Sequence, residues 1–280
     1  MIYLDYSATT KADTKVLNKF TETEEKYFAN PNSNHKLGKE ALNEIKEARK
    51  SIANLLNIKE NELIFTSGAS ESNNMVLKGL NMSHIITTKL EHSSITTPLG
   101  FLQTKNVKID FVNLEESGLI DINHLLSLID DNTKTLISIG AVNSETGLRQ
   151  PIEEIGKKLK KYPNVIFHSD ITQALGKCSF DLTNIDLASF SMHKIFGIKG
   201  IGGLIKKENI KLIPLIHGGK SLSIYRSGTP QTSLITSSSI AIKEAFTNLE
   251  EKYKYVEELN QYLKTNIKDL VTINSNSYSI

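Results

Sequence analysis

Short apolar runs alternate with helix-like stretches along most of this 280-residue chain, and this alternation limits its possible folds more than any other feature. Such alternation predicts βαβ units, and therefore an α/β fold with a mostly parallel sheet covered by helices. Little helix separates the last strands, so we expect that edge of the sheet to be mixed or antiparallel. Seven apolar runs are the predicted strands: residues 63–65, 85–86, 107–112, 135–139, 165–167, 187–190 and 203–205.

Helices are predicted where apolar residues recur near the 3.6-residue period. Ala41, Ile45, Ala48 and Ile52 mark one such face, after an extended start to the chain. A long amphipathic helix is expected from about residue 237 past Leu263, followed by a short strand. The predicted helices before it are residues 38–56, 70–80, 92–105, 122–129 and 152–160, and the last strand is residues 270–273.

Composition excludes several classes of function. The net charge of +2 gives no general attraction to nucleic acid, and no apolar run reaches the ~20 residues of a membrane span. The histidines show no paired metal-ligand spacing, so we expect no metal site. The single cysteine, Cys178, rules out an intrachain disulfide, and the first residues do not resemble a secretion signal. These features favour a cytoplasmic protein.

Two polar segments follow predicted strands, where open α/β sheets bind their ligands. Residues 65–74 pass from a strand through a small-residue turn into a helix, whose free N–H groups and serine hydroxyls could hold a phosphate or serve only as a helix cap. Asp170 directly follows another strand. Its carboxylate suits a cationic partner such as a protonated pyridine nitrogen, but it could also be a simple N-cap.

A lysine and a histidine complete the candidate chemistry. Lys194 follows a Ser-x-His pair and is flanked by apolar and aromatic residues, surroundings that lower the pKa of an amine and favour its attack on an aldehyde. It could instead be an exposed loop lysine. His92 also follows a strand, where a lone histidine is more often structural than functional, although an imidazole can stack on an aromatic cofactor.

Together and in this order, the polar segments resemble the class V, fold-type-I pyridoxal-phosphate (PLP) enzymes, and most of all the cysteine desulfurases. The resemblance implies a large PLP-binding domain, residues 14–235, and an incomplete small α/β domain from residues 1–13 and 236–280. The matching segments are residues 3–10, 30–35, 65–74, 91–92, 142–147, 168–173, 189–200, 217–219 and 226–229.

The resemblance also implies roles for individual residues. Lys194 would hold PLP as a Schiff base and move the substrate Cα proton, and His92 would stack on the ring. Asp170 would pair with the ring nitrogen, and Gln173 would bond the phenolic oxygen. Thr229 would reach the phosphate of a partner subunit in a homodimer. The remaining implied cofactor contacts are Ala69, Ser70, Asn143, Ser191 and His193.

The implied activity is conversion of L-cysteine to L-alanine, with the sulfur passing as a persulfide to an acceptor or scaffold protein for iron–sulfur cluster assembly or tRNA thiolation. In this family the nucleophilic cysteine and the carboxylate-binding arginine lie in a region that we expect this chain to lack. Cys178 does not match that cysteine, and we expect it to be buried.

The alternatives to this activity are a PLP-binding scaffold or partner protein without desulfuration, or another class V aminotransferase or lyase. With that region absent, the helical face between Ile242 and Leu263 should be exposed and apolar.

Overall fold

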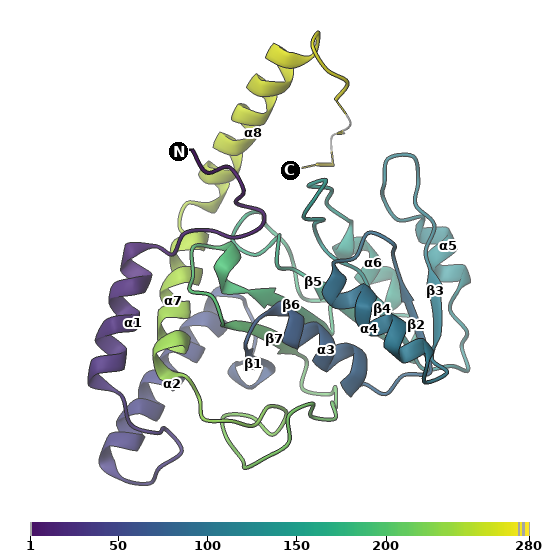
Figure 1. Ribbon diagram of the computed structural model, residues 1–280. Helices are drawn as coiled ribbons and strands as arrows, with labels where there is room; N and C mark the ends of the chain where they lie inside the picture. The colour runs from purple at the N-terminus through teal and green to yellow at the C-terminus, as the bar shows by residue number, and fades with distance from the viewer. Residues whose placement is uncertain (1, 274, 276–277, 280) are drawn as a thin grey trace.

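A computed structural model describes residues 2–273, 275 and 278–279 (Figure 1). The strands are β1 (Leu63–Thr66), β2 (His84–Thr87), β3 (Lys108–Phe111), β4 (Thr135–Ser138), β5 (Val165–Asp170), β6 (Leu187–Ser191) and β7 (Gly202–Lys206). The helices are α1 (Thr14–Lys26), α2 (Lys36–Leu55), α3 (Ala69–Gly79), α4 (Ser93–Gln103), α5 (Ile122–Ser127), α6 (Ile152–Leu159), α7 (Thr232–Phe246) and α8 (Leu249–Ile267), with short 3₁₀ turns η1 (Glu60–Glu62) and η2 (Met192–Lys194).

All seven predicted strands form, and they make one sheet in the order β1-β7-β6-β5-β4-β2-β3. Strands β2 to β6 run parallel, whereas β7 is antiparallel to both β1 and β6. The prediction of a mostly parallel sheet with a mixed edge is therefore confirmed. Strands β3 and β4 lie on opposite sides of β2, so the direction of winding reverses between β2 and β4, where sheets of this type bind ligands.

Helices cover both faces of the sheet because successive strand residues point to opposite sides. One apolar core joins the sheet to α2, α5, α6 and α7, and a second joins the opposite face to α3 and α4. Adjacent residues of β2 illustrate the division, since Ile85 belongs to the second core and Ile86 to the first. Apolar side chains cover both faces of the sheet. Polar side chains that could bind a ligand are therefore expected at the ends of the strands.

The prediction of an extended chain before residue 38 is wrong for part of that segment, because Thr14–Lys26 form helix α1. Asp13 caps this helix by accepting a hydrogen bond from the Lys15 backbone N–H at 2.7 Å. Only Val16 and Thr23 of the helix are buried, so its apolar pattern is weak. Packing against α7 stabilises it, and the Thr236 hydroxyl donates to the Thr23 hydroxyl at 3.0 Å across that contact.

The single long C-terminal helix is also wrong, because two helices, α7 and α8, replace it. Asn248 adopts a left-handed conformation with φ 53°, which asparagine tolerates better than most residues, and this breaks the helix. The expected strand at residues 270–273 does not form, and the chain there is irregular. No described helix is long and apolar enough to cross a membrane.

The expected exposed apolar face is confirmed for α8 and wrong for α7. Ile242 of α7 is fully buried, whereas no residue of α8 is buried. Figure 1 shows α8 extending away from the helices that cover the sheet. The proposed division into a large domain and an incomplete small domain remains a prediction.

Candidate active site

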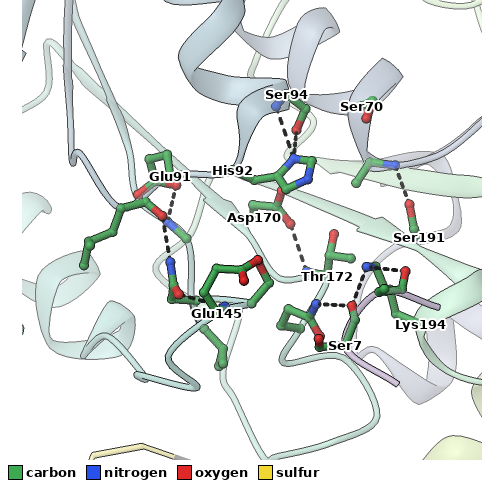
Figure 2. A pocket seen from close by; sticks show the side chains of 18 of the residues that line it. Ser7, Ser70, Glu91, His92, Ser94, Glu145, Asp170, Thr172, Ser191 and Lys194 are labelled. Atoms are coloured by element: carbon green, nitrogen blue, oxygen red, sulfur yellow. Dashed lines mark hydrogen bonds between the residues drawn. The ribbon is translucent and has the colours of Figure 1, made fainter. Parts of the chain in front are cut away.

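A cavity of about 500 Å³ opens at the carboxyl ends of the parallel strands. The segments that follow β2, β4, β5 and β6 line it, together with the start of α3 and the N-terminal segment around Ser7. Figure 2 shows Lys194, Asp170 and His92 around this space. Of the ten site residues that the sequence suggested, nine line this cavity, because parallel strands end at one edge.

Lys194 lies at the end of η2 and is half-buried in the cavity wall. Its ammonium donates to the carbonyl oxygens of Ser7 and Ala8 at 2.5 and 2.7 Å (Figure 2). Burial lowers the pKa of Lys194, while the negative charge of Asp170 acts in the opposite direction. The prediction of an amine with a lowered pKa is confirmed, and the reading as an exposed loop lysine is wrong.

Asp170 ends β5 and presents its carboxylate to the cavity. One oxygen accepts from the Asn73 amide at 2.8 Å, and the other accepts from the Thr172 backbone N–H at 2.9 Å. The Asn73 amide also donates to the Ser94 hydroxyl at 2.8 Å, and this hydroxyl lies 2.9 Å from His92 Nδ1. A continuous hydrogen-bonded chain therefore connects Asp170 with His92.

The start of α3 carries the candidate phosphate contacts. Gly68 precedes the helix with φ 153°, a conformation that L side chains rarely adopt, and it gives the helix no side-chain cap. The Ala69 backbone N–H donates to the Ser191 hydroxyl at 2.7 Å, which joins the start of α3 to the end of β6. Ser70 is exposed at the cavity (Figure 2). The start of α3 and the hydroxyl-bearing residues Ser70 and Ser191 thus lie together at the cavity.

The remaining predicted residues also lie at the cavity but make structural contacts as well. His92 Nδ1 accepts from the Ser94 backbone N–H at 3.1 Å, so His92 is also the N-cap of α4. The Asn143 amide donates to the Leu90 carbonyl at 2.8 Å, and its oxygen shapes the loop after β4. His193 Nδ1 lies 3.1 Å from the Thr9 hydroxyl.

Glu91 is a cavity residue to which the sequence assigned no role. Its carboxylate accepts from the Gly140 backbone N–H at 3.0 Å and from the Thr88 hydroxyl at 2.8 Å. These contacts connect the ends of β2 and β4, where the sheet reverses its winding. Burial raises the pKa of Glu91 to about 7, although both hydrogen bonds act in the opposite direction and Asp170 adds a smaller upward contribution.

Two sequence candidates lie outside the cavity. Thr229 is exposed and does not line the cavity, and its role at a partner subunit remains a prediction. Its segment is anchored by an ion pair between Arg226 and Glu71 at 3.0 Å. Cys178 is 2% exposed, and burial raises the pKa of its thiol. The prediction that Cys178 is buried is confirmed, and a thiol in such surroundings is a poor nucleophile.

The cavity residues fit PLP on three counts. Asp170 is bound by a neutral amide and a backbone N–H, so a cationic ring nitrogen would give its charge a partner. The buried hydroxyl of Thr172 lies in the cavity wall and has no hydrogen-bond partner in the protein. A bound ligand could supply this partner. The α3 start supplies donors suited to a phosphate, and Lys194 supplies the amine.

Sequence comparison places the chain in a family. The aminotransferase class-V family matches residues 2–279, and the chain belongs to this family. Among its relatives are cysteine desulfurases, as the sequence predicted. The IscS desulfurase of Rickettsia bellii (strain OSU 85-389) is 42% identical over 269 residues, which are 92% of this chain and 65% of the relative. A mitosomal cysteine desulfurase of Trachipleistophora hominis is 38% identical, over 96% of this chain and 63% of the relative.

Solved structures agree with these relatives. A NifS-like protein superimposes with a TM-score of 0.92 at 34% identity, covering 96% of this chain and 76% of its own. SspA in complex with cysteine superimposes with a TM-score of 0.82 at 38% identity, over 87% of this chain and 72% of its own. The fold-type-I prediction is confirmed. The chain spans 65% of the length of the R. bellii desulfurase.

Proposed function

We propose that this chain carries the PLP site of a cysteine desulfurase, which converts L-cysteine to L-alanine and releases the sulfur for iron–sulfur cluster assembly or tRNA thiolation. The observation that carries the proposal is that Lys194 and Asp170 line the same cavity as Ala69 and Ser70 at the start of α3. SspA, a structural relative, has been solved with cysteine, which supports an amino-acid thiol as the substrate class.

Bound PLP would supply an aldehyde that combines with amines and a ring that takes up electrons from the substrate Cα. The residues of the chain prepare the site for this chemistry. Lys194, with its lowered pKa, would provide the amine for the aldehyde and a base for the Cα proton. Asp170 would keep the ring nitrogen protonated by offering a fixed negative charge, and Asn73 and Thr172 hold that carboxylate in place. Ser70, Ser191 and His193 would hold the phosphate, with the Ala69 N–H.

His92 and Asn143 would lie against the ring, each held by its own loop contacts. The thiol that accepts sulfur is not Cys178, because that side chain is buried among apolar residues. The alternative function that the sequence left open is cofactor binding without sulfur transfer. Addition of cysteine to the PLP-loaded protein distinguishes the two, since only a desulfurase forms sulfide and alanine.

Covalent labelling tests the cofactor site. After incubation with PLP and reduction with borohydride, we expect the label on the peptide that contains Lys194, together with a visible absorption band before reduction. Lys194→Ala should lose both the label and the band. Lys199→Ala, which removes the exposed neighbouring lysine, should retain them. A label that persists in Lys194→Ala would contradict the proposed function.

We further propose a homodimer in the reducing cytoplasm, in which Thr229 contacts the phosphate at the partner's site. The exposed position of Thr229, outside the cavity of its own chain, supports this arrangement. Sedimentation should show a dimer, and Thr229→Ala should weaken PLP binding without changing the dimer. A monomeric wild type, or a Thr229→Ala protein that binds PLP as well as the wild type does, would contradict this arrangement.

A further inference from the structure

The side-chain amide of Gln173 has a donor end and an acceptor end, and its orientation decides which end the cavity meets. Its nitrogen donates to the Ser7 carbonyl at 2.9 Å, and its oxygen accepts from the Lys177 ammonium. A reversed amide would place its NH₂ group against that ammonium and its oxygen against the carbonyl. Two repulsive contacts would replace two hydrogen bonds, so these neighbours fix a single orientation.

Lys177 has no other polar side-chain contact in the part of the chain that the structure describes. None of the ion pairs there includes it, and its ammonium hydrogen-bonds only to Gln173. Burial, followed by the positive charge of Lys194, lowers the pKa of Lys177 to about 8. A half-buried ammonium without a carboxylate is unfavourable for stability, which points to a role in the site.

The turn that carries Lys177 is held firmly in place. Gly176 has φ 66°, and a Cβ atom there would lie 2.5 Å from the Cβ of Ala245 in α7. This close approach seats the turn on α7 and limits the movement of the following residue. The stem of Lys177 therefore leaves a fixed backbone before its ammonium reaches Gln173.

We propose that Lys177 is a positioning residue, which binds the amide oxygen of Gln173 and so keeps an amide N–H directed at the phenolic oxygen of bound PLP. The Gln173 nitrogen has two hydrogens, of which Ser7 takes one, and Gln173 lines the cavity. The second hydrogen is available to the ligand. The inference rests on the proposed function, because that function supplies the ring oxygen.

A pH titration of the visible absorption of the PLP-loaded protein tests this role. A donor to the anionic ring oxygen stabilises the deprotonated cofactor, so its loss should raise the titration midpoint. Lys177→Met removes the donor and retains the apolar stem, and we expect the midpoint to rise by about one pH unit. Lys177→Arg keeps a donor and should restore most of the difference. Lys199→Met removes a charge near the site without touching Gln173, and it should shift the midpoint by much less.

A double-mutant cycle distinguishes positioning from a direct charge effect. If Lys177 acts through Gln173, Lys177→Met should produce no further shift in a Gln173→Ala background. An equal shift in both backgrounds, or no shift in either, would overturn the proposal.

Nuclear magnetic resonance of the cofactor-free protein provides a readout that does not need PLP. The side-chain NH₂ signals of Gln173 should change in Lys177→Met and stay unchanged in Lys199→Met. If the wild type takes up no PLP but these signals respond as expected, the proposed function fails while the orientation of Gln173 stands. Unchanged Gln173 signals in a folded Lys177→Met protein would refute the positioning role itself.

Discussion

Helices α7 and α8 follow one another with only two residues between them, and they differ in what they bury. Helix α7 packs against α1 and α2, and Ile235 and Ile242 are at most 2% exposed. Helix α8 has an apolar side of its own, yet Tyr262 is 70% exposed and no residue of the helix is buried. The comparison shows that an amphipathic pattern predicts a helix, whereas burial needs a partner element that the pattern does not identify.

The two helices also differ in their relation to the cavity. Helix α7 contacts η2, which carries Lys194, and its Ala245 supports the turn at Gly176. Damage to α7 should therefore reach the site, while changes on the exposed side of α8 should not. Matched substitutions in the two helices can test the difference in burial between them.

The largest effect is expected for Ile242→Ala in α7. Ile242 is fully buried, and loss of its side chain should leave a cavity and lower the free energy of unfolding by about 2–5 kcal/mol. Leu259→Ala removes a similar side chain from α8, where it is 49% exposed, and should change the free energy by no more than about 0.5 kcal/mol. Urea unfolding measures both. Equal losses would mean that α8 is covered in solution.

The second prediction concerns Glu91. It tests whether a cavity residue lowers the stability of the fold, in contrast to the core residues around α7. Its pKa of about 7 lies above the ordinary glutamate value of 4.5, so the folded protein holds this proton more tightly than the unfolded chain. Below pH 4.5 the carboxyl group is protonated in both states and does not reduce the free energy of unfolding. As the pH rises from 4.5 to 7, the unfolded chain ionises first, so the free energy of unfolding falls. Glu91→Gln should thus match the wild type near pH 4.5 and be more stable at pH 8, by up to roughly 3 kcal/mol.

The measurement is the free energy of unfolding from urea titrations at several pH values. Glu47→Gln, an exposed substitution on α2, is the matched control and should show no such pH-dependent gain. A Glu91→Gln protein that is less stable than the wild type at pH 8 would show that the ionised carboxylate stabilises the fold, through its bonds to Gly140 and Thr88. The expected result would show that the cavity, unlike the core around α7, keeps a group that reduces stability.

The sheet and the cavity were predictable from the sequence because strand periodicity is local and parallel strands end at one edge. Asp170 and Lys194 each follow a strand, so the topology alone brings them together. Helix α1 was not predictable, since only Val16 and Thr23 mark its inner face. The break between α7 and α8 depends on one residue, Asn248, whose left-handed conformation no pattern of apolar residues reveals.

Supporting residues of the cavity were missed for a different reason. Glu91 acts through Gly140, and Asn73 acts through Asp170, so each depends on a partner far away in the sequence. Lys177 looks like an ordinary surface lysine until the fold places it against Gln173, four residues earlier. Local patterns identify residues that meet a ligand more readily than residues that hold them.

The smallest effect on stability is expected on the exposed side of α8. The double variant Val256→Lys and Leu259→Lys should leave the free energy of unfolding within about 0.5 kcal/mol of the wild type, because both side chains are already exposed. Binding of a dye that fluoresces on apolar surfaces should fall, since the substitutions interrupt a patch that also includes Tyr255, Tyr262 and Leu263. The control, Glu257→Lys, places a charge on the same helix without removing an apolar side chain, and its dye binding should stay close to that of the wild type. Unchanged dye binding in the double variant, or a clear loss of stability, would mean that this side of α8 is covered in solution and would remove the contrast with α7.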